Sequence, residues 1–142
     1  MQVNDLTHAI IGAAMKVHTA LGPGLLENAY KVCLMHELRS SGIKLRTEVE
    51  LPVVYNGVRV ELGYRLDMLV EDLVIVELKC VESFTPLHKG QLLSYLKLSN
   101  KNVGLLINFQ TAHLKDGIQR LVYGRGWDRP DYSASVASVA KN

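Results

Sequence analysis

Residues 73–80, LVIVELKC, combine an almost uninterrupted apolar run with two charged side chains, Glu77 and Lys79. An apolar run of this length is typical of a central β-strand that is covered on both faces. Because Glu77 and Lys79 are two residues apart, their side chains leave such a strand on the same face. Burying an ionised group costs several kcal/mol unless the group is paired or binds a metal. The two charges are therefore either a simple ion pair near an exposed strand end or part of a functional site.

A further charge, Asp67, interrupts the preceding apolar segment, YRLDMLV. The loop that joins the two strands decides whether Asp67 meets Glu77. A two-residue loop at Glu71-Asp72 pairs Asp67 with Val76 and places Glu77 on the opposite face. A three-residue loop instead pairs Asp67 with Glu77 on one face, and a bulge has the same effect. A site built from both carboxylates therefore predicts an odd-length connection or a bulge.

Two carboxylates beside a lysine suit the hydrolysis of phosphodiester bonds. Hard divalent cations such as Mg²⁺ bind oxygen ligands and keep several waters for substrate phosphate. Such a cation lowers the pKa of a bound water and offsets charge on the phosphate. A lysine orients or deprotonates that water, or stabilises the developing charge. Asp67, Glu77 and Lys79 are the candidates for this chemistry, with Mg²⁺ or Mn²⁺ as the cofactor.

Apolar periodicity and turn residues around the charged strand predict an α/β fold. The expected order is α-α-β-β-β-α-β-β, a mixed β-sheet flanked by helices. The first helix is expected to be capped by Asn4 or Asp5 and to end near Ala20. The second helix is expected over about residues 25–39. Its buried side is predicted to carry Leu26, Tyr30, Cys33, Leu34 and Leu38.

The remaining elements follow from local signals. Asn56-Gly57 lies between two alternating runs and predicts a type I′ hairpin, whose return strand continues to Val70. A third helix is expected over about residues 86–98, with Pro86 in its first turn. The segments VGLLINF and IQRLVY then predict two further strands.

Length and composition limit the class of protein. The 142 residues, of which 48% are hydrophobic and 21% charged, fit one domain and exclude a disordered chain. We expect a single domain over residues 1–130 and a flexible tail over residues 131–142. No apolar run is long enough to span a bilayer and no basic leader is present, so no membrane association and a cytoplasmic location are expected. The net charge of +2 supplies no strong attraction to nucleic acid.

Three motifs together resemble a known family. Asp67, followed by Glu77-Leu78-Lys79, resembles the D…ExK core of the PD-(D/E)xK nuclease superfamily. The segment Gly24–Tyr30 is a complete GxxExxY, for which a small bacterial protein family is named. Gln91–Tyr95 is similar to the QxxxY segment of the RecB-like branch of these nucleases. The resemblance covers about residues 5–122 and implies a restriction-endonuclease-like fold.

The resemblance also implies roles for the charged strand residues. Asp67 and Glu77 would be the metal ligands, and Lys79 would be the catalytic lysine. The chain departs from the superfamily at Leu66, which stands where the family name places a proline.

Three residues outside the strands acquire roles through the same resemblance. Glu27 would support the metal site; alternatively, it is a carboxylate that the helix dipole stabilises by ~0.3–1 kcal/mol. Gln91 would position water, phosphate or Lys79, and Tyr95 would brace Gln91, since the two are i,i+4 neighbours on a helix. Without the resemblance, Tyr95 is an aromatic side chain at the edge of the core.

The implied function is a metal-dependent nuclease that hydrolyses phosphodiester bonds through a metal-activated water. DNA is the expected substrate, and RNA is the second candidate. The alternative is a catalytically silent module that keeps the nuclease fold and binds nucleic acid or protein. A third interpretation is a structural homodimer with the apolar first helix at its interface.

Overall fold

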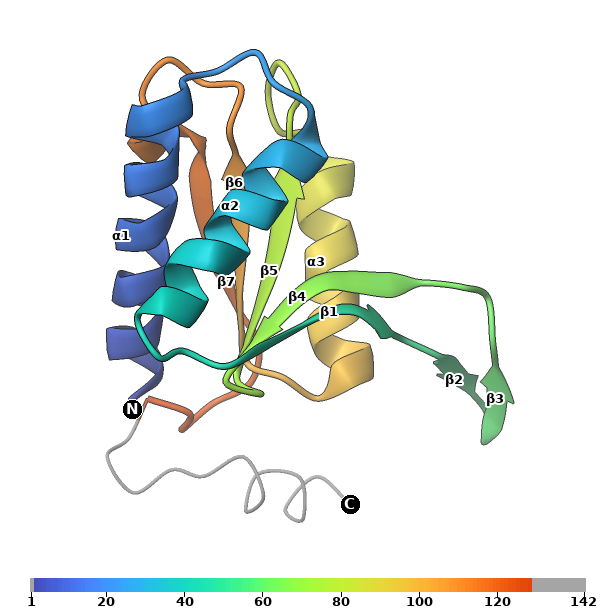
Figure 1. Cartoon of the computed structure of the whole chain (residues 1–142). Coiled ribbons are helices and arrows are strands. Elements are labelled where there is room, and N and C mark those ends of the chain that lie inside the picture. Colours follow the sequence, from blue (N-terminus) through green and yellow to red (C-terminus); the bar gives the residue numbers. More distant parts are fainter. Residues whose placement is uncertain (1, 129–142) are drawn as a thin grey trace.

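Figure 1 shows the computed structural model of the chain, in which residues 2–128 are described. The expected domain end at residue 130 and the expected tail at 131–142 lie outside the described residues. In chain order, the elements are α1 (Val3–Leu21), α2 (Glu27–Ser40), β1 (Leu45–Glu50), β2 (Val53–Tyr55), β3 (Val58–Val60), β4 (Arg65–Val70), β5 (Val74–Lys79), α3 (Pro86–Ser99), β6 (Val103–Asn108), the short 3-10 helix η1 (Leu114–Gly117) and β7 (Ile118–Val122).

A mixed five-stranded sheet with the order β1-β4-β5-β6-β7 forms the centre of the molecule. Only β5 and β6 run parallel, and the other neighbours are antiparallel. Helices α1 and α2 cover one face of the sheet, and α3 covers the other (Figure 1). The predicted α/β class with a mixed sheet between helices is therefore confirmed. Within residues 2–128, no helix is long and apolar enough to cross a membrane.

Strand β5 separates two layers of the hydrophobic core. Val76 and Leu78 pack in the cluster formed with α1 and α2, whereas Ile75 packs in the cluster formed with α3. Because side chains alternate along a strand, Glu77 and Lys79 extend from the face that carries α3.

The apolar stripe of α1 packs against the hydrophobic core of the same chain. Ile10, Ala14 and Val17 are buried against the core, and Ile11 packs partly against it. This stripe is therefore not available as the interface of a structural homodimer. Dimerisation through another surface stays a prediction.

Two predicted helix starts are wrong. Helix α1 begins at Val3 with Gln2 at its N-cap, so Asn4 and Asp5 lie inside the first turn, because packing of Val3 into the core extends the helix. Helix α2 begins at Glu27, two residues later than predicted. Leu26 is its N-cap and is 83% exposed, because it precedes the first turn and does not share the buried stripe.

The predicted hairpin is confirmed, but it lies outside the main sheet. Asn56 and Gly57 have φ values of 50° and 74°, as a type I′ turn requires. Among the described residues, strands β2 and β3 pair only with each other, and they project from the domain as a ribbon (Figure 1). The return strand does not run on to Val70 without interruption, since residues 61–64 are irregular and Gly63 has a φ of 77°.

Tyr30 anchors the connection between α1 and α2. Its hydroxyl donates a 2.5 Å hydrogen bond to the Gly22 carbonyl and accepts one of 3.1 Å from the Leu25 backbone N–H. Its fully buried ring stacks on Phe109 with the ring centroids 4.5 Å apart. Gly24, within the connection, has a φ of 109°, which favours glycine. The last residue of GxxExxY is thus a core residue that fixes the loop ahead of α2.

We expect Tyr30→Phe to lower the free energy of unfolding by about 1–3 kcal/mol, because two loop backbone groups lose their partner. Urea unfolding followed by circular dichroism measures this difference. Tyr55→Phe, at the exposed tip of the ribbon, is the matched control and should leave the stability unchanged. A Tyr30→Phe chain as stable as its parent would show that the hydroxyl does not hold the loop.

Candidate active site

The connection between β4 and β5 brings two carboxylates together. Val70 pairs with Val74, so residues 71–73 form a three-residue connection. The first two of these residues have φ values of 51° and 58°. This register continues to put Asp67 opposite Glu77, on the same face of the sheet. The predicted odd-length connection is confirmed, and the two-residue loop is excluded.

Reciprocal hydrogen bonds hold the two carboxylates in place. Asp67 Oδ2 accepts a hydrogen bond of 2.9 Å from the backbone N–H of Leu78. The backbone N–H of Asp67 donates to Glu77 Oε1 over 3.4 Å. These side-chain hydrogen bonds replace the next pair of backbone hydrogen bonds between β4 and β5. Each carboxylate is therefore fixed by the backbone of the strand that carries the other.

A bend in β1 lies beside Asp67, on the edge of β4 that faces away from β5. Strands β1 and β4 keep one register before and after this point, but Glu48 and Asp67 between them do not pair. Glu48 has a φ of 51°, which is uncommon for a residue with a side chain. The packing of β4 also changes here, since Met68 faces the α1–α2 cluster and Leu66 faces the α3 cluster. The bend therefore lies across β4 from the hydrogen bond between the Asp67 N–H and Glu77.

The Glu77 carboxyl is buried, with 5% of the residue exposed. Burial raises its pKa to about 9, and the hydrogen bond and negative charge of the Asp67 side chain contribute to this rise. The nearby Lys79 ammonium lowers the pKa only in part. At neutral pH and without a cation, Glu77 therefore keeps its proton beside Asp67.

Glu27 approaches this pair from the first turn of α2. Partial burial raises the pKa of Glu27, and the nearby Asp67 carboxylate raises it further, whereas Lys79 lowers it. Glu27 also contributes, after burial, to the raised pKa of the Cys80 thiol next to the end of β5. Glu27, Asp67 and Lys79 are therefore electrostatic neighbours at the carboxyl end of β5.

Sequence reasoning missed an ion pair beside Glu27. Lys31, whose side chain is only 13% exposed, pairs with Glu48 at the bend of β1. Both charges also act on Glu27. The pair joins α2 to the strand that borders Asp67. The i,i+4 spacing of Glu27 and Lys31 on one helix face was the available signal, but the bend that brings Glu48 to them has no local signature.

The two named residues of the QxxxY segment lie in different environments. Tyr95 is buried, and burial together with the nearby Glu77, Tyr64 and Asp67 raises its pKa. Its ring lies 6.3 Å from that of Tyr64 between centroids. Gln91, one helical turn earlier, is exposed, and its side chain makes no hydrogen bond with another group in residues 2–128. Tyr95 thus lies at the carboxylates, while Gln91 faces solvent.

Asp67 and Glu77 could hold a divalent cation. Both supply carboxylate oxygens, the donors that Mg²⁺ and Mn²⁺ prefer. In the part of the chain that the structure describes, no group of three or more His, Cys, Asp and Glu side chains is arranged to bind a metal. A cation here would have two protein ligands and would leave positions for water and phosphate, as Mg²⁺ sites do.

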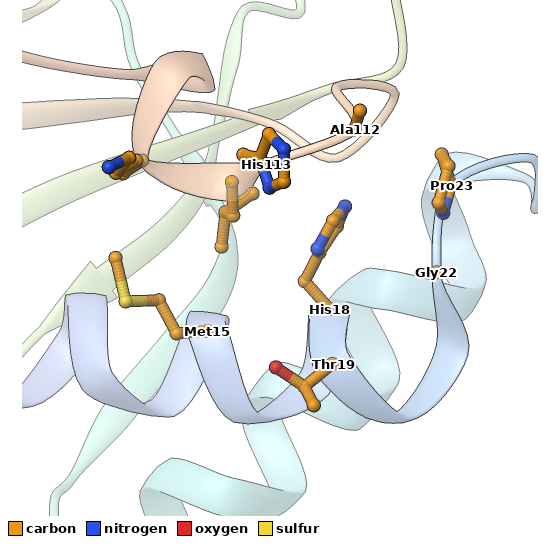
Figure 2. A pocket seen from close by; sticks show the side chains of 9 residues that line it. Met15, His18, Thr19, Gly22, Pro23, Ala112 and His113 are labelled. Atoms are coloured by element: carbon orange, nitrogen blue, oxygen red, sulfur yellow. The ribbon is translucent and has the colours of Figure 1, made fainter.

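A separate pocket of about 440 Å³ lies between the end of α1 and the segment that leads into η1 (Figure 2). In Figure 2, His18 rises from α1 toward His113. The Nε2–H of His18 donates to the carbonyl of Thr111 over 2.8 Å. His18 therefore ties α1 to the chain after β6.

Comparisons with known proteins bear on the family and the fold. A family model described as "PD-(D/E)XK nuclease superfamily" matches residues 4–121. The solved structure titled "Crystal structure of SSO0001" is similar, with a TM-score of 0.54 and 20% sequence identity over 81% of this chain and 56% of that one. The chain thus spans little more than half the length of that structure, and the similarity shows the fold. No curated protein matches the chain. The expected restriction-endonuclease-like α/β fold is confirmed.

The raised pKa of Glu77 makes the stability depend on pH. A carboxyl whose pKa is 4.5 when unfolded and about 9 when folded contributes less stability as the pH rises through this window. Glu77→Gln keeps a hydrogen-bonding side chain without the ionisation. We expect this variant to exceed the parent in Tm by about 4 °C or more at pH 8, and to match it near pH 5.

Calorimetric melting of both chains across this pH range, without divalent metal, tests the expectation. Glu50→Gln, an exposed position on β1, is the control and should show no such pH-dependent difference. A constant difference between Glu77→Gln and parent at all pH values would contradict the raised pKa.

Proposed function

The chain belongs to the PD-(D/E)XK nuclease superfamily, and from this premise we propose that it cleaves phosphodiester bonds of DNA with a divalent metal. Nucleases of this superfamily bind nucleic acid and generally use divalent metals. The observation that carries the proposal is the reciprocal Asp67–Glu77 pair beside Lys79. A buried carboxyl with a pKa near 9 has no benefit for the stability of the sheet at neutral pH. A cation bound at the Glu77 carboxyl would account for its burial.

Asp67 and Glu77 would hold Mg²⁺ or Mn²⁺ in this proposal. When bound, the cation lowers the pKa of a water molecule and offsets negative charge on the phosphate. The Glu77 carboxyl must lose its proton to become a ligand, so metal binding and proton release are coupled. The backbone N–H groups of Asp67 and Leu78 keep both carboxylates oriented throughout.

The neighbouring side chains would bind and orient the substrate. The Lys79 ammonium, at the end of β5, would stabilise the charge that develops on the phosphate oxygens. Glu27 would position Lys79 electrostatically, and the Lys31–Glu48 pair would keep Glu27 in place. Gln91 would orient water or phosphate from α3, and Tyr95, whose pKa the nearby Glu77 and Asp67 raise, would lie beside the carboxylates.

We also propose a narrower placement within the superfamily. The complete GxxExxY at Gly24–Tyr30 supports the GxxExxY family, and Gln91–Tyr95 supports the RecB-like branch. RNA remains a second candidate substrate. The alternative function is a catalytically silent module that binds nucleic acid or protein, which the small net charge of +2 favours.

Mn²⁺ binding tests the carboxylate site directly. We expect isothermal titration calorimetry to give about one ion per chain, with binding lost in both Asp67→Asn and Glu77→Gln, because each removes one of two protein ligands. Asp72→Asn, in the exposed β4–β5 connection, is the control and should bind as the parent does. Unchanged binding in either ligand variant, or no binding even with short DNA present, would favour the silent module.

Cleavage tests the role of Lys79. We expect Lys79→Ala to slow DNA cleavage in Mn²⁺ by roughly 10²–10³-fold while keeping metal binding, because the variant loses charge stabilisation at the phosphate. Lys97→Ala, an exposed lysine near the end of α3, serves as the control in the same gel assay. An undiminished rate in Lys79→Ala would refute the assigned role.

A further inference from the structure

A buried amide side chain, that of Asn108, lies one strand away from Lys79. Asn108 is the last residue of β6 and is 1% exposed. Its register partner on the parallel strand β5 is Lys79. Because side chains alternate along a strand and Leu106 packs in the cluster formed with α3, Asn108 extends from the same sheet face as Lys79. The amide therefore neighbours the strand position from which the lysine side chain begins.

The Asn108 amide binds both backbone groups of Val81. Its Oδ1 accepts hydrogen bonds of 3.1 Å from the N–H groups of Val81 and Gln110, and its Nδ2 donates over 2.7 Å to the Val81 carbonyl. The Lys79 carbonyl accepts a 3.0 Å hydrogen bond from the Phe109 N–H. Strand β5 ends at Lys79, so the Asn108 side chain continues, for Val81, the pairing that the β6 backbone provides up to Lys79.

These hydrogen bonds fix the chain where it leaves the sheet after Lys79. The other five residues of β6 are buried and are either apolar or glycine. An apolar residue at position 108 would extend this run, but it would leave the N–H and carbonyl groups of Val81 without these partners. Lysine carries its charge on a flexible four-carbon stem. The position of the Lys79 ammonium therefore depends on how firmly the end of β5 is held.

We propose that Asn108 is a positioning residue for Lys79. By holding Val81, it fixes the end of β5, so that the Lys79 ammonium stays beside Asp67 and Glu77. The inference rests on the proposed nuclease function and adds to its site a residue that lies outside the D…ExK, GxxExxY and QxxxY segments. Asn108 acts through the backbone and binds neither the cation nor the phosphate.

A double-mutant cycle tests this inference. Single-turnover cleavage of DNA in Mn²⁺ is measured at a temperature at which circular dichroism shows every chain to be folded. We expect Asn108→Ala to slow cleavage by about 10–100-fold and to keep the affinities for DNA and Mn²⁺ within about twofold, because only the orientation of Lys79 is lost. In the Lys79→Ala background, the same substitution should change the rate by less than about twofold, because the positioned group is already absent.

Asn102→Ala is the matched control. Asn102 is 9% exposed and directly precedes β6, at the end of the strand away from Lys79, where its Nδ2 donates over 2.8 Å to the Tyr123 carbonyl. We expect both asparagine variants to unfold at lower urea concentration than the parent, and Asn102→Ala to cleave at the parental rate. If Asn108→Ala does not fold, Asn108→Thr replaces it in the cycle, since threonine suits a strand and keeps one polar group.

The outcomes separate this inference from the nuclease function itself. A parental cleavage rate in the Asn108 variant, an equal loss in Asn102→Ala, or the same loss with and without Lys79 would overturn this inference and leave the nuclease function intact. A parent chain that cleaves neither DNA nor RNA would overturn the proposed function and this inference with it.

Discussion

The register between β4 and β5 is the constraint on which the rest of the site depends. A connection one residue shorter or longer would send either Asp67 or Glu77 to the opposite face of the sheet. Keeping both on one face places a carboxyl with a pKa near 9 inside an otherwise apolar strand. The fold limits this cost through backbone hydrogen bonds from Asp67 and Leu78 and through the nearby charge of Lys79.

Two residues of the GxxExxY segment, Tyr30 and Glu27, have different structural roles. Tyr30 points into the core, where its ring stacks on Phe109 and its hydroxyl holds the loop between α1 and α2. Glu27, almost one turn earlier, lies on the side of the carboxylates. Because the buried tyrosine fixes where α2 begins, it also fixes the position of Glu27. A structural residue and a residue of the candidate site are therefore linked within one short helix segment.

Local signals predicted the parts of the fold that depend on neighbouring residues in sequence. The Asn56-Gly57 turn, the apolar strand with Glu77 and the helix that begins at Pro86 all have such signals. The exposure of Leu26 and the bend at Glu48 do not. Leu26 is exposed because the loop held by the Tyr30 hydroxyl sets the start of α2, and the bend at Glu48 accompanies a change of core layer along β4 that depends on elements distant in sequence.

The β2–β3 ribbon gives the chain a place where its length can vary. The hydrogen bond from the Leu51 N–H to the Tyr64 carbonyl, 2.8 Å long, joins the two sides of the ribbon at its base. The β1–β4 ladder begins directly beyond this bond. Since closing a longer surface loop costs little free energy, residues added at Asn56-Gly57 would not displace Asp67. A recognition peptide or a reporter inserted in the ribbon would therefore leave the Asp67–Glu77 pair in place.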